Sequence, residues 1–237
     1  MDAIHRKHLS WGIFLAVTFL AVLAVIFSPI FGEGRNGLAF ADDLFNKLSK
    51  GSSYFIPKIM KTNEKFMGKT FAVTIQIEKP EEAEKIAGLF STAGAFAEVQ
   101  GPELRLEGDL GRVVEAVLRD SEDMYRNQGS RIASAYGMNE KDAMKLWWQA
   151  LDKMGKVFAK EKMIEEAKLV SDTNKKAVET AYNYYGIEAQ KVTEKAVLMT
   201  GLLIFYVIYT LWWGFAIFNI FEGIGLTMKK AKVKKEI

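Results

Sequence analysis

Histidine and cysteine, the residue types behind most metal and redox sites, are almost missing from this chain. The sequence contains two histidines, His5 and His8, and no cysteine. Disulfides, thiolate metal sites, iron–sulfur clusters and covalently attached haem are therefore excluded. Beyond residue 8 we also expect no histidine-ligated haem, zinc or copper and no Ser-His-Asp triad. We predict that the protein has no cofactor; calcium alone stays open, because carboxylates can bind it unaided.

Neighbouring carboxylates are the remaining candidates for acid–base catalysis. They occur as Asp42 with Asp43, Glu81 with Glu82, Glu122 with Asp123, and Glu165 with Glu166. Acid–base work needs two carboxyl groups in environments that separate their pKa values, and none of these pairs has a sequence setting that would bury it. We interpret each pair as a solvated helix face. The chain also lacks a P-loop and a G-x-G-x-x-G motif, so we predict that it is not an enzyme.

A long uncharged run near the C-terminus dominates the organisation of the chain. Residues 196–221 read AVLMTGLLIFYVIYTLWWGFAIFNIF. About 20 apolar residues in a helix cross a hydrocarbon core of roughly 30 Å, so this run predicts a transmembrane helix. Residues 222–237 follow as a basic tail whose lysines are typical of a cytoplasmic flank: Lys229, Lys230, Lys232, Lys234 and Lys235.

The N-terminal region offers two alternatives. Residues 1–10 form a short basic tail, and residues 11–31 form a second apolar run. The run is either a retained signal-anchor helix or a signal peptide cut after Ala39-Phe40-Ala41. We favour retention, because the run is longer than a usual signal-peptide core and ends about ten residues before that site. Retention predicts a two-pass protein of the inner or plasma membrane, with both termini cytoplasmic and the central domain extracytoplasmic.

Residues 32–69 are expected to form an amphipathic helical segment, interrupted at Gly51 and Pro57. In its second half the apolar residues follow a helical period, while lysines occupy the opposite side. A cationic face of this kind can contact an anionic membrane surface, and the candidates for that contact are Lys58, Lys61 and Lys65. The alternative, a domain helix with a solvated lysine face, is the one we favour.

Residues 70–130 predict a small α+β unit. Strands are expected at Phe71–Glu78, Phe96–Val99 and Glu103–Glu107, with helices that begin near Pro80 and Asp109. The order β-α-β-β-α is most of a ferredoxin-like unit. Because that unit carries many unrelated activities, it says little about function.

Residues 139–195 are expected to form a long helical hairpin. We place its break at Ser171–Asn174 and expect the second arm to continue unbroken into the membrane run. Apolar residues at spacings of three and four mark one stripe, and the adjacent Trp147 and Trp148 cannot both face the same seam. The aromatic clusters form either a core between the arms or an interface. The predicted partner interface comprises Met144, Trp147, Trp148, Leu151, Met154, Phe158, Tyr182 and Tyr185.

This layout predicts a non-catalytic scaffold or accessory subunit of a membrane protein complex, whose partners are other membrane subunits or a second copy of the chain. Nucleic acid is not expected as a partner, because the net charge of +3 comes from the tails. A homo-oligomeric two-helix channel or transport component is the alternative, and a sensor is a further one. The layout is also similar to that of polysaccharide chain-length regulators, although no proline follows Pro102 where those proteins carry a proline-rich segment.

Overall fold

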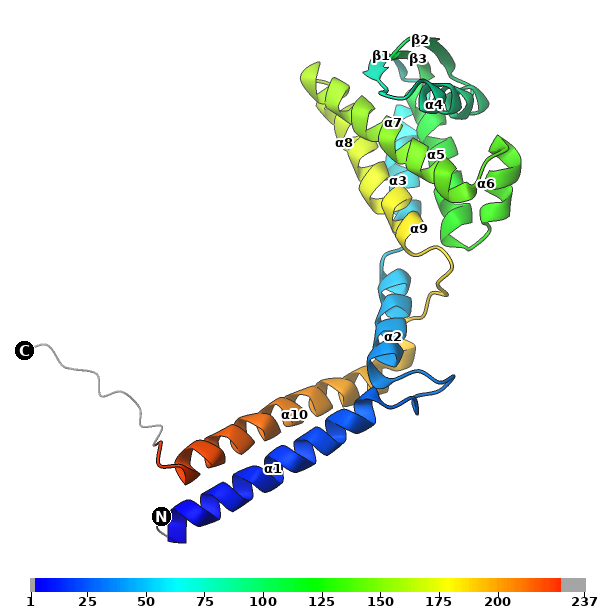
Figure 1. Cartoon of the computed structure of the whole chain (residues 1–237). Helices are drawn as coiled ribbons and strands as arrows, with labels where there is room; N and C mark the ends of the chain where they lie inside the picture. Colours follow the sequence, from blue (N-terminus) through cyan, green and yellow to red (C-terminus); the bar gives the residue numbers. More distant parts are fainter. Residues whose placement is uncertain (1–2, 227–237) are drawn as a thin grey trace, which may run out of the picture. The chain divides into compact units, whose positions relative to one another are not determined.

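A computed structural model describes residues 3–226 of the chain (Figure 1). The described residues are mostly helical and contain one small three-stranded sheet, so the protein belongs to the mixed α+β class. They fall into two compact units, the first within residues 1–45 and 191–237 and the second within residues 46–190. The predicted lysine cluster at 229–235 lies outside the described residues.

Unit 1 contains the two apolar helices that the sequence predicts. Helix α1 spans Ala3–Phe27 and helix α10 spans Ala196–Gly223, preceded by a short 3-10 helix, η3 (Val192–Lys195). Both α1 and α10 are long and apolar enough to cross a membrane. Helix α1 ends four residues before the end of its apolar run, because Pro29 disfavours a helical conformation at the residue before it.

The two apolar helices lie side by side and antiparallel (Figure 1). The indole N–H of Trp212 donates to the carbonyl oxygen of Leu15 over 3.1 Å, and the hydroxyl of Tyr209 donates to that of Phe19 over 3.2 Å. The rings of Phe19 and Tyr209 stack with their centroids 4.1 Å apart. Moving from Leu15 to Phe19 along α1 therefore corresponds to moving back from Trp212 to Tyr209 along α10, as in an antiparallel helix pair.

Two glycines allow the backbones of this helix pair to touch. A Cβ added at Gly12 would lie 2.7 Å from the backbone nitrogen of Ile220, and one added at Gly223 would lie 2.6 Å from Cα of Leu9. Real Cβ atoms do not approach so closely. Small residues at such crossings give membrane helices the close van der Waals contact that stabilises their association.

Unit 2 is built on the small sheet. Its strands are β1 (Thr70–Gln76), β2 (Phe96–Gln100) and β3 (Glu103–Asp109), arranged in the order β1-β3-β2 with antiparallel neighbours. Side chains alternate across each strand, so Phe71, Val73 and Ile75 of β1 enter the core while their neighbours are exposed. The three predicted strands are therefore present, with ends shifted by one or two residues.

Helices pack against the buried face of the sheet and against one another. They are α3 (Ile56–Asn63), α4 (Pro80–Thr92), α5 (Leu110–Tyr125), α6 (Gly129–Tyr136), α7 (Glu140–Lys160), α8 (Ile164–Thr173) and α9 (Glu179–Asn183). Helix α2 (Gly37–Ser52) crosses the division between the two units. Two short turns complete the unit, the 3-10 helix η1 (Glu64–Phe66) and the π-helix η2 (Asn174–Val178). Pro80 begins α4, and Asp109 caps α5 by accepting from the backbone N–H of Arg112, as the sequence predicts for these starts.

Helix α7 carries the apolar stripe into the centre of unit 2. The indole of Trp147 contacts Phe90 with ring centroids 5.0 Å apart, and Phe158 meets Phe71 edge to face at 6.3 Å. The prediction that the stripe forms a partner interface is wrong, because the whole α+β unit packs on it and not only the second helical arm. Five members are at most 1% exposed: Met144, Trp147, Leu151, Met154 and Phe158.

The helical hairpin breaks at a different place from the predicted one. Its turn lies between α7 and α8, where Lys162 adopts a left-handed φ of 63°, and the chain stays helical through Ser171–Asn174. The second arm also does not run unbroken into α10. It leaves the helix after Asn183 and reaches α10 only through a loop and η3.

A buried lysine joins the two ends of unit 2. Lys50 is 1% exposed, and its ammonium group donates to the carbonyl oxygens of Ile187 (2.5 Å) and Tyr184 (3.1 Å) and to Oδ1 of Asn127 (3.2 Å). The ring of Tyr125 lies 4.9 Å from the same nitrogen. Burial lowers the pKa of Lys50 below its ordinary value, and these contacts replace the lost hydration of its charge.

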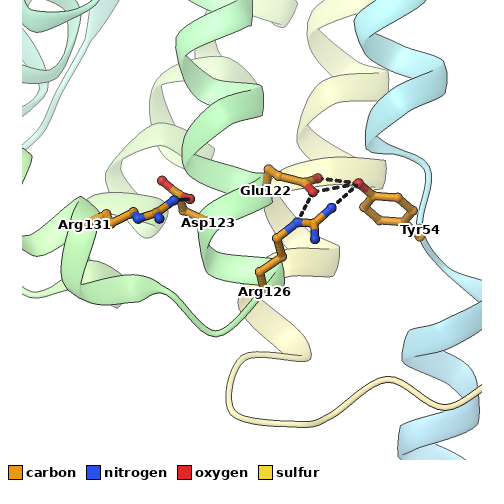
Figure 2. A network of polar contacts seen from close by, with 5 residues as sticks. All are labelled: Tyr54, Glu122, Asp123, Arg126 and Arg131. Carbon is orange, nitrogen blue, oxygen red and sulfur yellow. Dashed lines mark hydrogen bonds and ion pairs between the residues drawn. The ribbon is translucent and has the colours of Figure 1, made fainter.

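Figure 2 shows a polar network on the surface of the same part of unit 2. The hydroxyl of Tyr54 donates to both carboxylate oxygens of Glu122, at 2.7 and 2.8 Å, and Arg126 forms an ion pair with the same carboxylate. Beside them Arg131 pairs with Asp123 at 2.9 Å. The two neighbouring carboxylates, Glu122 and Asp123, are therefore each paired with a different arginine. Through its bonds with Tyr54, Glu122 also joins the connection between α2 and α3 to α5.

Candidate partner-binding surface around Trp148

Trp148 is the most exposed aromatic side chain of α7. Its neighbour Trp147 is fully buried, while Trp148 is 40% exposed, because adjacent positions on a helix point about 100° apart. The indole N–H of Trp148 donates to Oε1 of Glu179 over 2.7 Å, and its carbonyl oxygen accepts from Nδ2 of Asn174 over 3.0 Å. Glu179, from the second arm of the hairpin, thus holds the ring at the surface, while Asn174 from the same arm bonds the backbone of Trp148.

The π-helix η2 brings these two residues to the same tryptophan. Asn174 and Glu179 are five positions apart, which in an α-helix would turn their side chains roughly 140° from each other. In η2 the backbone N–H of Glu179 instead bonds to the carbonyl oxygen of Asn174, so position 179 returns above position 174. The wider turn is what lets both side chains reach Trp148.

Two hollows flank the Trp148 side chain. One, of about 390 Å³, is lined by residues that include Lys145, Trp148 and Tyr182. The other, of about 300 Å³, lies between α7 and α8 and is also bordered by Trp148 and Glu179. We refer to Trp148, Glu179, Tyr182 and these two hollows as the Trp148 face. An indole between two concavities can anchor a protein partner, since exposed aromatic anchors in pockets dominate interface energetics.

The two tyrosines predicted for the interface lie close to this surface. Tyr182 is 39% exposed and lines the larger hollow, with the ammonium of Lys141 6.0 Å from its ring. Tyr185 is half-buried and donates its hydroxyl to Oε1 of Glu140 over 3.0 Å. Burial, followed by this bond, raises the pKa of Tyr185. Of the eight predicted interface residues, Trp148 and Tyr182 are the ones whose side chains are openly available.

Asn174 is the polar residue of this surface that sequence reasoning missed. It is 6% exposed, and its Oδ1 has no hydrogen-bond partner among the described residues. The amide orientation is fixed, because only Nδ2 can donate to the carbonyl oxygen of Trp148. No sequence signal marked this residue, since Asn inside Ser171–Asn174 indicates a turn and the π-helix has no motif of its own.

Two of the lysines predicted to touch a membrane surface, Lys58 and Lys61, lie on the outer side of α3, and Lys65 lies in η1 directly after it. Lys58, Lys61 and Lys65 are exposed, whereas Ile56 and Ile59 on the other side of the helix enter the core of unit 2. Lys65 lies 3.7 Å from Glu165 of α8. Ile56, Ile59 and Phe66 of this segment are therefore occupied by the core of unit 2, whereas Phe55 and Met67 stay exposed.

One carboxylate, Asp120, is buried deeply enough to have a perturbed pKa. Its Oδ2 accepts from the hydroxyl of Tyr136 at 2.6 Å and from the indole N–H of Trp147 at 2.8 Å. Burial raises the pKa of Asp120, and the two donors oppose that shift. The titratable group that contacts it is the hydroxyl of Tyr136, whose own pKa is raised by burial and by the charge of Asp120. This tyrosine therefore keeps its proton at neutral pH, and we interpret Asp120 as a structural element of the core.

Among residues 3–226 no group of three or more His, Asp or Glu side chains is arranged to hold a metal ion. Members of the predicted acidic pairs instead form separate ion pairs with basic residues, Glu122 with Arg126 and Glu166 with Lys69. Comparison of the chain with protein-family models, with curated proteins and with solved structures returned no match.

Proposed function

We propose that this protein is a non-catalytic, membrane-anchored scaffold or accessory subunit that binds a partner protein through the Trp148 face. The observation that carries the proposal is Trp148 itself, whose ring is 40% exposed between two hollows and is held in place by the bond from its indole N–H to Glu179. An indole held in one position loses little conformational entropy on binding, which favours it as an interface anchor.

We further propose that α1 and α10 cross the inner or plasma membrane, with both termini in the cytoplasm and unit 2 outside. The antiparallel arrangement of the two helices supports an even number of crossings, and the Lys/Arg content of the tails favours the cytoplasm for both ends. We also propose that unit 2 contains a ferredoxin-like unit, and the strand order β1-β3-β2 supports this proposal.

The orientation can be tested with single cysteines, since the native chain has none. Cysteine in place of Ser52 or Ser130 should react with an impermeant maleimide in intact spheroplasts. Cysteine in place of Lys234 should react only after the cells are opened. Labelling of position 234 in intact spheroplasts would overturn the proposed topology.

The channel alternative has less support, because three polar residues of the two apolar helices, Thr18, Thr210 and Asn219, are hydrogen-bonded within the helix pair. Nδ1 of His8 lies 2.9 Å from Oδ1 of Asn219, whose Nδ2 donates to a backbone carbonyl of its own helix. Thr18 and Thr210 likewise donate to carbonyl oxygens one turn earlier. A pore would instead need polar side chains that face water.

The partner role is tested by substituting the anchor in the full-length protein. Trp148→Ala should weaken the complex with the partner that co-purifies in mild detergent by about thirtyfold, the loss expected for an aromatic anchor worth about 2 kcal/mol. Phe96→Ala is the matched control, because Phe96 is an aromatic side chain at least as exposed as Trp148 (55% against 40%) that lies on β2 and lines neither hollow. Affinity is measured with the purified partner, and a thermal melt shows whether each variant is folded. Equal affinity of both variants would refute the proposal.

A further inference from the structure

The outer edge of strand β1 is open. In an antiparallel ladder, residues whose N–H and C=O groups bond to the neighbouring strand alternate with residues whose groups point away from it. At one end of β1, the carbonyl oxygen of Lys69 accepts from the N–H of Leu110 over 2.9 Å. At the other end, the N–H of Ile77 donates to the carbonyl oxygen of Pro102 over 2.8 Å. The odd-numbered residues therefore bond to β3, and the outward-facing backbone groups belong to Thr70, Ala72, Thr74 and Gln76.

These outward-facing groups have no hydrogen-bond partner among residues 3–226, and all four residues are exposed. Helix α7 packs on the buried face of the sheet, where Phe158 meets Phe71, and does not close the edge. A hollow of about 540 Å³ remains between the middle of β1 and the end of α7. Its lining includes Ala72, Val73, Thr74, Val157, Lys160 and Glu161. The edge is therefore accessible to a further strand.

Strand β1 lacks the features that usually protect a sheet edge from pairing. Protected edges are short, or they carry charges, a proline or a bulge. The sequence of β1 is TFAVTIQ, seven residues without charge, glycine or proline, and its register with β3 is continuous. The opposite edge, β2, has five residues and carries Glu98, and the N–H of Ala95 directly before it donates to the carbonyl oxygen of Phe90. The comparison indicates that β1 is the edge available for pairing.

The sequence of β1 is complementary to a second copy of itself. In an antiparallel pairing centred on Val73, Ala72 lies opposite Thr74 of the second copy, and Thr70 lies opposite its Gln76. Every outward-facing N–H and C=O group of both strands then has a partner. The facing side chains are small or polar and uncharged, so no like charges meet across the pair.

The charges beside the hollow favour the same occupant. Lys160 and Glu161 are exposed, line the hollow next to Ala72 and Thr74, and form no ion pair among the described residues. Neighbouring charges of opposite sign are complementary to their own copy, because a two-fold axis near Val73 can bring Lys160 of each chain towards Glu161 of the other.

From these observations we propose that β1 pairs antiparallel with β1 of a second copy, so that the two three-stranded sheets become one continuous sheet in a two-fold symmetric dimer. Strand addition of this kind gains its affinity from main-chain hydrogen bonds. The pairing edge shares no lining residue with the two hollows of the Trp148 face. The dimer therefore does not depend on the proposed function and leaves that face free for another protein.

The test compares charge patterns at the centre of the pairing in the full-length protein, purified in mild detergent. In the double variant Ala72→Lys with Thr74→Lys, each new lysine lies opposite another lysine, and like charges directly opposite are destabilising. The dimer dissociation constant, measured by analytical ultracentrifugation, should rise at least about tenfold. The matched control is Ala72→Glu with Thr74→Lys, in which opposite charges meet, and it should dimerise at least as tightly as the native protein. Thermal melts show that both variants are folded, since both positions are exposed.

Disulfide crosslinking tests the register independently, in a chain that has no cysteine of its own. Copies with Ala72→Cys, co-expressed with copies that carry Thr74→Cys, should form a disulfide-linked dimer, because directly opposite residues lie about 5.5 Å apart. Either variant alone should crosslink poorly, because a residue is then about 9 Å from its own equivalent, beyond the reach of a disulfide.

A monomeric native protein, or equal dissociation constants for the two double variants, would overturn the dimer. Crosslinking that is as efficient in the single variants as in the mixture would also contradict the proposed pairing. The Trp148 face is judged separately, since Trp148→Ala should leave the dimer dissociation constant unchanged even where it weakens the binding of a partner protein.

Discussion

The carboxylate of Glu179 accepts the indole N–H of Trp148 over 2.7 Å, across 31 positions of the chain. This bond sets the orientation of the most exposed aromatic ring of α7. Glu179→Leu should release the ring, so that the Trp148 indole proton exchanges faster with water and its NMR signal moves towards that of a free indole. Glu179→Gln, which keeps an acceptor oxygen at the same place, should leave the signal nearly unchanged. The bond has no orienting role if both variants give the same spectrum.

Asp120 should make unit 2 less stable as pH rises. Its pKa is raised above the ordinary value of about 3.9, chiefly by burial, so the folded state holds the proton more tightly than the unfolded state does. The stabilising contribution is fully present below the unfolded pKa and is lost as pH rises through the folded pKa. Asp120→Asn removes the titration while its side-chain oxygen can still accept from Tyr136 and Trp147. In thermal melts from pH 4 to 8, the melting temperature of the mutant should rise relative to that of the native protein as pH rises.

Tyr136→Phe tests the same carboxylate by shifting the pKa of Asp120 and not by removing its titration. The hydroxyl of Tyr136 favours the charged form of Asp120, so its removal should raise the pKa of Asp120 further. The pH at which the stability falls should therefore move upward. A profile identical to that of the native protein would show that another group is titrating.

The ion pair of Glu166 with Lys69 should have the reverse dependence on pH. The hydrogen bond from Lys69 is the largest cause that lowers the pKa of Glu166, a carboxylate that is 8% exposed. Its contribution is present above the unfolded pKa of about 4.3 and disappears as pH falls through the lower folded pKa. Lys69→Met should cost about 1–2 kcal/mol at pH 7, less than for a fully buried pair, because Lys69 is 45% exposed.

The control for Lys69→Met is Lys65→Met, which removes an exposed pair with Glu165 at 3.7 Å. Exposed pairs contribute little, and we expect a change below about 0.5 kcal/mol at any pH. Chemical unfolding at pH 7 and pH 3 should show the cost of Lys69→Met shrinking at the lower pH. A cost that is equal at both values would mean that Lys69 contributes through its contact with Phe66 and not through its pair with Glu166.

Glycine contacts should decide whether the two spans stay paired. Gly12→Val or Gly223→Val would place a Cβ within 2.7 Å of the opposite backbone, so the helices must separate. Gly214→Val is the matched control, since a Cβ there meets nothing within 4 Å. A cysteine pair at Phe19 and Tyr209, in a chain with no other cysteine, should crosslink in the control and lose most of that crosslinking in the first two variants. Retained crosslinking would show that the pairing does not depend on close backbone contact.

The elements that local pattern defines could be predicted from the sequence. The run 196–221 lies within α10, and the alternation in Phe71–Glu78 marks β1 because burial of one sheet face has a period of two residues. The turn between α7 and α8 could not be predicted in this way. It contains neither glycine nor proline, and its left-handed residue is Lys162, whose conformation is maintained by the packing of the two helices.

The Trp148 face could be predicted only in part. Helical spacing separates Trp147 from Trp148, but it does not indicate which ring is buried, because that depends on where the sheet and α4 lie. Asn174 and Lys50 were missed for a related reason. Their neighbours in sequence are polar and typical of exposed positions, and both are buried by segments distant in sequence, Asn174 beside Trp148 and Lys50 beside residues 184–187.

The lysine that joins the two ends of unit 2 has a mechanical consequence. The chain enters the unit near Asn46 and leaves it near Gln190, and the backbone N–H of Gln190 donates to the carbonyl oxygen of Lys47 over 3.0 Å. Tension that pulls these two ends apart would load this bond and those of Lys50 first, before the sheet. Single-molecule pulling at positions 46 and 190 should show an early rupture that Lys50→Met removes, while the main unfolding force is unchanged. Lys50 would then be the contact that yields first when unit 2 is pulled at its two ends.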